Sequence, residues 1–340
     1  MKRFCLLCSL TLIVICKSVS LTGAKVPETA KIALASNRDG NWDIYLMNPD
    51  GSRVVNLTQH PASDFYPVWS PTGEQLLFVS NRDGPSSLYL MDADGANIRR
   101  VSDQILTRLR AAWAPDGGGI AYMRLDELYI TTIDGKAITH LAKINGKHTG
   151  DLAWSPDGTE IAFRVFKDME GEKGYELRTF DLQTHKEKTI LADVEKYPEK
   201  MSPAWAPSGD KLALSLYQRP LGKNIGENVF VIDADDIFDW REQETIYVIN
   251  RDGSELQRIV PDKGSKSTYP AWSPHGDEII YQQKVTGLTQ LFKINVTSGD
   301  PIQLTDIGDN AVANWFDPGV VPVQPNAKLL ATLWGTLKQK

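Results

Sequence analysis

The sequence has no cysteine beyond its first sixteen residues. Its three cysteines, Cys5, Cys8 and Cys16, all lie at the start of the chain. If that segment is removed on export, the rest of the chain has no thiol for a disulfide, a metal site or a nucleophile. Cysteine chemistry is therefore excluded from the function that we expect.

Blocks of positive charge and common catalytic motifs are also missing. The 340 residues carry a formal net charge of −6 without a basic block, so we expect no nucleic-acid partner. There is no Gly-x-Ser-x-Gly, the run Gly117–Gly119 is not followed by Gly-Lys-Ser or Gly-Lys-Thr, and the five histidines lack metal-ligand spacing. We predict a protein that is not an enzyme and binds no cofactor.

The chain begins with a short hydrophobic run. Two basic residues precede Phe4–Cys16, which is apolar at all but two positions, and small polar residues follow. This pattern is typical of a secretory signal peptide and is too short for a permanent transmembrane helix. We expect residues 1–24 to be removed, with cleavage after Ser20 or Ala24 both open, while the bulky residue before Cys16 disfavours a lipoprotein start. The mature protein is then periplasmic or secreted and has no transmembrane helix.

What the sequence does contain is a repeat. The element Trp-(Ser/Ala)-Pro-x-Gly occurs five times and a degenerate sixth copy follows, at intervals of 44, 41, 51, 67 and 43 residues. A period in the low forties is that of a four-stranded propeller blade. The constant tryptophan register disfavours the alternative, a sandwich with repeated turns. The copies start at Trp69, Trp113, Trp154, Trp205, Trp272 and Trp315.

The position before each tryptophan predicts how the units pack. In five of six units it holds a small or β-branched apolar residue, which suits inner strands crowded around an axis. The indole would then fill the space between neighbouring units. These residues are Val68, Ala112, Ala153, Ala204, Ala271 and Asn314.

The two ends of the chain complete the ring. Residues 31–58 have strands two to four of a unit but no Trp strand, and residues 311–316 have a Trp strand alone. Pairing them gives a sixth blade and removes the open sheet edges. We therefore predict an all-β, six-bladed β-propeller over residues 25–316, closed by strands from both termini. The tail, 317–340, would form an extra strand, a short amphipathic helix or a docking segment.

These units resemble the propeller of the TolB family, the periplasmic component of the bacterial Tol–Pal envelope system. The best-matching stretches are Ile32–Thr58, Tyr66–Ser102 and Tyr269–Thr305. The resemblance concerns the propeller alone, because TolB proteins carry an α/β domain before it, where this sequence has only a short segment. It implies a monomeric scaffold whose partner is another envelope protein or a peptidoglycan-associated lipoprotein, although the fold by itself does not fix the function.

Three acidic segments could be taken for ligand loops. Ser36–Gly40 and Ser80–Gly84 both read Ser-Asn-Arg-Asp-Gly, and Asp92–Gly95 has the opening of a calcium loop. Each stands where a turn between strands is expected, and the glycine of Asp92–Gly95 comes too early for a calcium loop. We interpret all three as turns. A calcium ion is compatible with these residues but is not predicted.

A binding site is expected at the channel rim, where loops lead into the inner strands. The longest interval predicts an insertion, 218–244, between the second and third strands of the fifth unit and on the same face. Aromatic residues among charges suit a binding loop. The candidate residues are Asp64, Arg108, Arg110, His148, Asp151, Lys200 and Asp309 at the rim, and Phe238 and Trp240 in the insertion.

The rival hypothesis is a propeller that binds or cleaves a glycan or a peptide in the channel. It would use carboxylates such as Asp64, Asp151 and Asp309. Glycoside hydrolysis needs two carboxylates about 5–10 Å apart, a distance that a sequence does not give. The lack of a catalytic motif favours the non-enzymatic scaffold.

Overall fold

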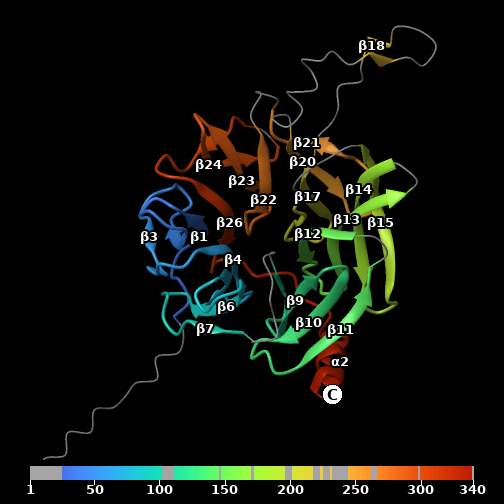
Figure 1. Cartoon of the computed structure of the whole chain (residues 1–340), viewed down its shortest axis with the longest axis horizontal. Helices are drawn as coiled ribbons and strands as arrows, with labels where there is room; N and C mark the ends of the chain where they lie inside the picture. Colours follow the sequence, from blue (N-terminus) through green and yellow to red (C-terminus); the bar gives the residue numbers. More distant parts are fainter. Residues whose placement is uncertain are drawn as a thin grey trace, which may run out of the picture.

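The computed structural model of the chain is a ring of six four-stranded antiparallel sheets around a central channel (Figure 1). The six-bladed all-β propeller predicted from the repeat is thereby confirmed. No helix in the described part of the chain is long and apolar enough to cross a membrane. The structure describes residues 25–101, 111–144, 147–169, 172–195, 201–216, 223–224, 230–231, 244–261, 266–297 and 299–338.

Each sheet is called a blade and is named by its inner strand, which faces the channel. Three blades, from inner to outer strand, are β26 (Asn310–Phe316), β1 (Lys31–Ser36), β2 (Asp43–Met47), β3 (Val55–Asn56); β4 (Asp64–Trp69), β5 (Gln75–Ser80), β6 (Ser87–Asp92), β7 (Arg99–Arg100); and β8 (Ala112–Trp113), β9 (Gly119–Arg124), β10 (Glu127–Thr132), β11 (Ile138–Lys143). The others are β12 (Lys147–Trp154), β13 (Glu160–Met169), β14 (Glu172–Asp181), β15 (Lys186–Glu195); β16 (Ala204–Trp205), β17 (Lys211–Leu216), β20 (Thr245–Asn250), β21 (Gln257–Arg258); and β22 (Ser267–Trp272), β23 (Glu278–Val285), β24 (Leu288–Asn295), β25 (Ile302–Gln303).

Strands from both ends of the chain close the ring, as expected. β26 pairs antiparallel with β1, and Trp315 lies opposite Ile32 in this register. The last inner strand therefore sits in the same blade as the first three strands of the propeller. The ring is thereby closed, and sheet edges remain only at the outer strands of the blades, such as β3.

Each repeat tryptophan packs in the hydrophobic cluster between two neighbouring blades. Trp113, for example, is 7% exposed and lies in a cluster with Leu77 and Leu90 of the β4 blade and Ile120 of its own blade. The small residues that precede the six tryptophans line the channel, together with Asn314. Both features of the predicted packing are confirmed.

The Ser-Asn-Arg-Asp-Gly segments are turns that brace the blades. In the second copy, Arg82 donates to the Asp64 carboxylate at 3.0 Å, and Asp83 accepts a 2.6 Å hydrogen bond from the Tyr89 hydroxyl. Burial, followed by the hydrogen bond to the carboxylate, raises the pKa of Tyr89 to about 12. In the turn of Ser36–Gly40 on the β26 blade, Asp39 likewise accepts from the Tyr45 hydroxyl at 2.7 Å, but Arg38 donates to the side-chain oxygen of Asn310 at 2.8 Å instead of to a carboxylate. The arginine and aspartate therefore have structural partners within the fold.

The longest interval between repeat tryptophans falls within the β16 blade. β17 and β20 are hydrogen-bonded neighbours, so the extra residues join the second and third strands of the β16 blade. Within the insertion, the short pair β18 (Lys223–Asn224) and β19 (Phe230–Val231) is described.

The tail contains a helix, α2 (Ala327–Lys338), which is one of the three predicted alternatives. Asn326 begins it: the backbone N–H of Asn326 donates to the Asp157 carbonyl at 2.8 Å, and its side-chain oxygen accepts from the Leu329 N–H at 3.1 Å. This side-chain bond is an N-cap. Leu330 is fully buried in the cluster between the β8 and β12 blades, so the helix is docked on the ring.

Candidate functional site

The channel has two chemically different mouths, because all six inner strands run in the same direction. The inner strands begin where the loops from the preceding blades enter them, close to the turns that follow the second strands. We call this end of the channel the loop mouth. They end at the Trp-(Ser/Ala)-Pro turns, and we call this end the turn mouth. Two of the predicted rim residues are described at the loop mouth: Asp64 begins β4, and Asp309 directly precedes β26.

Four inner strands share an irregularity three residues before the tryptophan. The backbone φ is positive at Tyr66, Ser202, Tyr269 and Val312, with values of 57°, 30°, 55° and 45°. The register of β4 and β22 shifts at this point, as in a β-bulge. L side chains rarely adopt this conformation, and strain is greatest for the branched Val312. The bulge re-aims one side chain per blade away from the regular strand direction.

The re-aimed side chains meet inside the channel. Tyr66 and Tyr269 belong to blades that the β26 blade separates, yet their ring centroids are 6.4 Å apart and their side chains are hydrogen-bonded. Asp151 has the same position in the β12 blade and accepts a 2.7 Å hydrogen bond from the Ser202 hydroxyl. Side chains of non-adjacent blades can meet only where they project into the channel. We call the set Tyr66, Asp151, Ser202, Tyr269 and Val312 the waist ring.

The waist ring is buried but polar. Asp151 is 6% exposed and Tyr269 is 8% exposed. Burial raises the pKa of Tyr269, and the nearby charge of Asp151 raises it further. The Tyr269 hydroxyl therefore stays protonated at neutral pH and can donate a hydrogen bond. Phenol rings, hydroxyls and a carboxylate are groups that suit the recognition of a peptide or a glycan.

The structure does not bring the predicted acidic residues together. Asp151 lies in the waist ring, but Asp64 is fully buried in its ion pair with Arg82. Asp309 accepts a 2.8 Å hydrogen bond from the backbone N–H of Thr289 and connects the β22 and β26 blades. His148 lies in β12, and nothing is described of its side chain. The remaining candidates lie outside the described residues: Arg108, Arg110, Lys200, Phe238 and Trp240.

Sequence reasoning did not single out Tyr66, Ser202 or Tyr269, although a signal for them exists. Aligning the repeats on the tryptophan gives one residue per blade at the bulge position. That column of the alignment mixes aromatic, charged and small residues, unlike the apolar columns of the core. It reads Tyr66, Arg110, Asp151, Ser202, Tyr269 and Val312.

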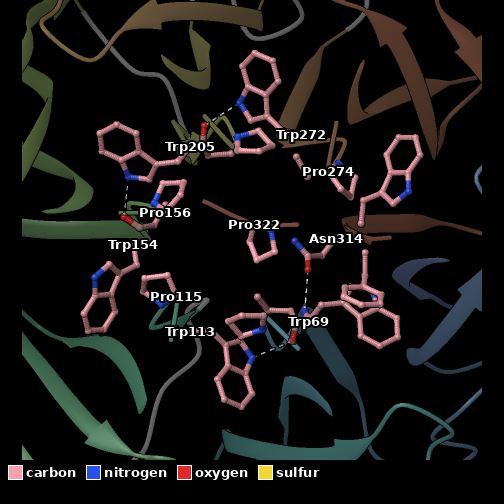
Figure 2. A pocket seen from close by; sticks show the side chains of 18 of the residues that line it. Trp69, Trp113, Pro115, Trp154, Pro156, Trp205, Trp272, Pro274, Asn314 and Pro322 are labelled. Carbon is pink, nitrogen blue, oxygen red and sulfur yellow. Dashed lines mark hydrogen bonds between the residues drawn. The ribbon is translucent and has the colours of Figure 1, made fainter. Parts of the chain in front are cut away.

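The turn mouth is lined by proline rings and the edges of the indoles (Figure 2). A cavity of about 480 Å³ lies between the turns. Figure 2 shows Pro322 of the tail near the centre of this ring of turns. The prolines of the turns that line it are Pro71, Pro115, Pro156, Pro207 and Pro274.

Hydrogen bonds from the indoles tie neighbouring blades together at this mouth. The Trp113 N–H donates to the Val68 carbonyl of the preceding blade at 3.2 Å. Trp205 and Trp272 make the equivalent bonds at 3.2 and 3.1 Å. These bonds link neighbouring blades directly at the turn mouth.

Among the described residues, no group of three His, Cys, Asp or Glu side chains is arranged to hold a metal ion. In the segment that resembles a calcium loop, the Asp94 carboxylate accepts a 3.0 Å hydrogen bond from the Ala96 N–H, as in an ordinary turn. The chemistry that the channel offers is hydrogen bonding and apolar contact.

Known proteins resemble the chain in sequence over part of the propeller. Residues 11–143 match the family described as the TolB beta propeller domain, PD40. The Tol-Pal system protein TolB of Geobacter sulfurreducens is 42% identical over 57 residues, which are 17% of this chain and 13% of that protein. The sequence match therefore spans only a small part of that relative's length.

Solved structures extend the likeness to nearly the whole fold. TolB from Acinetobacter baumannii superposes with a TM-score of 0.65 at 16% identity, over 87% of this chain and 68% of that one. A putative TolB from Agrobacterium tumefaciens gives a TM-score of 0.58 at 17% identity, over 85% and 98% of the two chains. At such identities the superposition concerns the fold alone. Together with the sequence matches, it identifies the chain as carrying a TolB-like β-propeller domain.

Proposed function

We propose that this chain is an exported, non-enzymatic scaffold of the bacterial cell envelope. It acts as a monomer in the periplasm and binds another envelope protein, such as a peptidoglycan-associated lipoprotein, at the loop mouth. The waist ring is the observation that carries the proposal. Tyr66 and Tyr269 are rigid anchors that combine an apolar face with a hydroxyl, as binding hot spots do. Strained backbone at equivalent positions of four blades is typical of functional sites.

The loops above the waist ring supply further contacts in this proposal. Arg108, Arg110, His148 and Lys200 would add charge-assisted hydrogen bonds around Asp151, and the aromatic residues of the insertion, Phe238 and Trp240, would cover the bound segment. Mixed charges at such a rim steer a partner and fix its orientation.

The carboxylates favour binding over hydrolysis. Asp64 is engaged in an ion pair with Arg82, Asp309 accepts a backbone hydrogen bond, and Asp151 accepts one from Ser202. A glycosidase of the usual kind needs two carboxylates facing one substrate bond. These three belong to three blades and to separate hydrogen-bond networks.

The test is a pull-down of solubilised envelope proteins with the purified chain, residues 25–340. We expect one stoichiometric partner, and at least tenfold weaker binding after the double substitution Tyr66→Phe and Asp151→Asn. Tyr281→Phe is the matched control, because it removes a buried hydroxyl that has no hydrogen-bond partner in the described structure and lies between blades. Equal retention of the partner by the double variant would exclude the waist ring, and retention of no protein at all would exclude the scaffold.

A further inference from the structure

The tail crosses the turn mouth between two fixed points. It leaves the ring at Phe316, the end of β26, and Val320–Val323 line the same cavity as the turn prolines (Figure 2). It returns to the ring at Asn326, whose N–H donates to the Asp157 carbonyl at 2.8 Å. We call the crossing segment, residues 320–325, the strap.

The strap is held over the mouth loosely. Within the described structure, no hydrogen bond joins residues 321–325 to the turns. Val321 is 82% exposed and Val323 is 38% exposed, although both are apolar and border an apolar cavity. The strap therefore lies across the mouth through apolar contact, without a hydrogen bond from residues 321–325 to the turns in the described structure.

The anchor is α2, through Leu330 and Trp334. Leu330 is fully buried, and the Trp334 indole N–H donates to the Asp116 carboxylate at 2.7 Å. Gly118 makes room for this indole, because a Cβ there would lie 2.6 Å from its nitrogen. A helix of this length is marginal in water by itself, so docking maintains it. Release of Trp334 would consequently free both the helix and the strap.

The strap has the sequence of a recognised class of peptide ligand. Pro322 and Pro325 form a Pro-x-x-Pro pattern, which favours the extended polyproline II conformation. Such segments dock on grooves lined by aromatic side chains and lose little conformational entropy in doing so. The turn mouth is lined by indole edges and prolines, so a ligand of this class already lies on it in the form of the strap.

We propose that the turn mouth is a binding site for an extended apolar peptide of the Pro-x-x-Pro class, carried by a partner protein. The strap occupies this site intramolecularly and the partner displaces it. Because the strap is tethered on both sides, it competes with the partner's peptide at a high effective concentration. The docking of α2 therefore sets the fraction of molecules in which the site is free. This site is at the opposite end of the channel from the loop mouth and does not depend on the function proposed there.

The probe is a fluorescein-labelled peptide with the sequence of residues 319–326, titrated into the full mature chain and followed by anisotropy. Trp334→Ala removes the indole that anchors α2, and Gly118→Ala fills the space that this indole occupies. Limited proteolysis of the tail reports the release of α2. We expect both variants to bind the peptide at least tenfold more tightly than the wild type. Thr336→Ala, on an exposed part of α2, is the control and should behave as the wild type.

A second peptide, with alanine in place of both prolines, should bind the released variants at least tenfold more weakly. Equal binding of the two peptides, or no peptide binding by variants whose tail has become protease-sensitive, would overturn the proposed site. A tail that stays protected in both variants would overturn the role of Trp334 as its anchor. Thermal unfolding by circular dichroism verifies that the ring is intact in each variant.

Discussion

The side-chain oxygen of Asn314 accepts a 2.8 Å hydrogen bond from the backbone N–H of Trp69. The two residues come from opposite ends of the chain and sit in adjacent blades. Asn314 stands where the other units have alanine or valine, and next to it Phe316 packs on the Trp69 ring at 5.4 Å between centroids. The closing strand β26 is therefore hydrogen-bonded through a side chain to the inner strand of the adjacent β4 blade.

We predict that Asn314→Ala lowers the free energy of unfolding by about 1–2 kcal/mol, because the buried Trp69 N–H loses its acceptor. Urea denaturation followed by circular dichroism measures this change. Asn314→Asp keeps an acceptor oxygen and should retain most of the stability at neutral pH. An unchanged midpoint in the alanine variant would show that this hydrogen bond is not needed for closure.

Alanine should be tolerated less well at the glycine of the first Ser-Pro-x-Gly turn than at its counterpart in the next blade. Gly73 and Gly117 have nearly the same φ, +71° and +72°, so alanine is strained equally at both. At Gly73, however, a Cβ would lie 2.1 Å from Cζ of Phe316, while nothing lies within 4 Å at Gly117. We expect Gly117→Ala to cost about 1 kcal/mol and Gly73→Ala about 1–3 kcal/mol more. Equal urea midpoints for the two variants would refute the role of Phe316.

The fold was predictable because its signals are local and repeated. A turn of the same chemistry follows five of the six repeat tryptophans. The first strands of the propeller lack a Trp strand and the last Trp strand lacks a following hairpin, so pairing the two predicts closure through β26. The docking of α2 was not predictable in this way. It depends on Gly118 leaving room for Trp334, two residues far apart in sequence that share no pattern.

The site was predicted less well, for a physical reason. Charged residues in loops were taken as ligand-binding groups, but Asp64 has a partner eighteen residues later, Arg82, which buries its charge in the blade. The tyrosines of the waist ring, Tyr66 and Tyr269, look like core residues unless the positive φ is known, because a regular strand would not aim them at the channel.

The indole hydrogen bonds predict a difference between two equally buried tryptophans. Trp113 and Trp154 are both 7% exposed, but the Trp113 N–H donates to Val68, while the Trp154 N–H has no partner in the described structure. We expect Trp113→Phe to lower the free energy of unfolding by about 1 kcal/mol more than Trp154→Phe does. Both variants lose a similar volume, so their comparison in urea isolates the hydrogen bond. A larger loss in Trp154→Phe would contradict the prediction.

Arg251 clamps the β16 blade to the β12 blade through Asp157. Its guanidinium lies 2.7 Å from the Asp157 carboxylate and 5.3 Å from the centre of the Trp205 ring. Burial alone would raise the pKa of Asp157, but hydrogen bonds from Ser155, Arg251 and Thr159 outweigh it and lower this pKa to about 2. The folded value is thus below the unfolded one, near 3.8. The clamp contributes stability that is present above about pH 4 and is lost as the pH falls towards 2.

We predict that Asp157→Asn lowers the free energy of unfolding at pH 7 by about 1–2 kcal/mol, less than the pKa shift alone implies because the pair is partly exposed. The difference between variant and wild type should shrink below pH 4 and become small near pH 2, where the pH reaches the pKa of the folded wild-type carboxyl. Urea unfolding at pH 7, 4 and 2 measures it. Arg251→Lys should reproduce part of the loss at pH 7, since lysine keeps the charge but not the forked geometry. A difference that is the same at all three pH values would mean that Asp157 acts through packing and not through its charge.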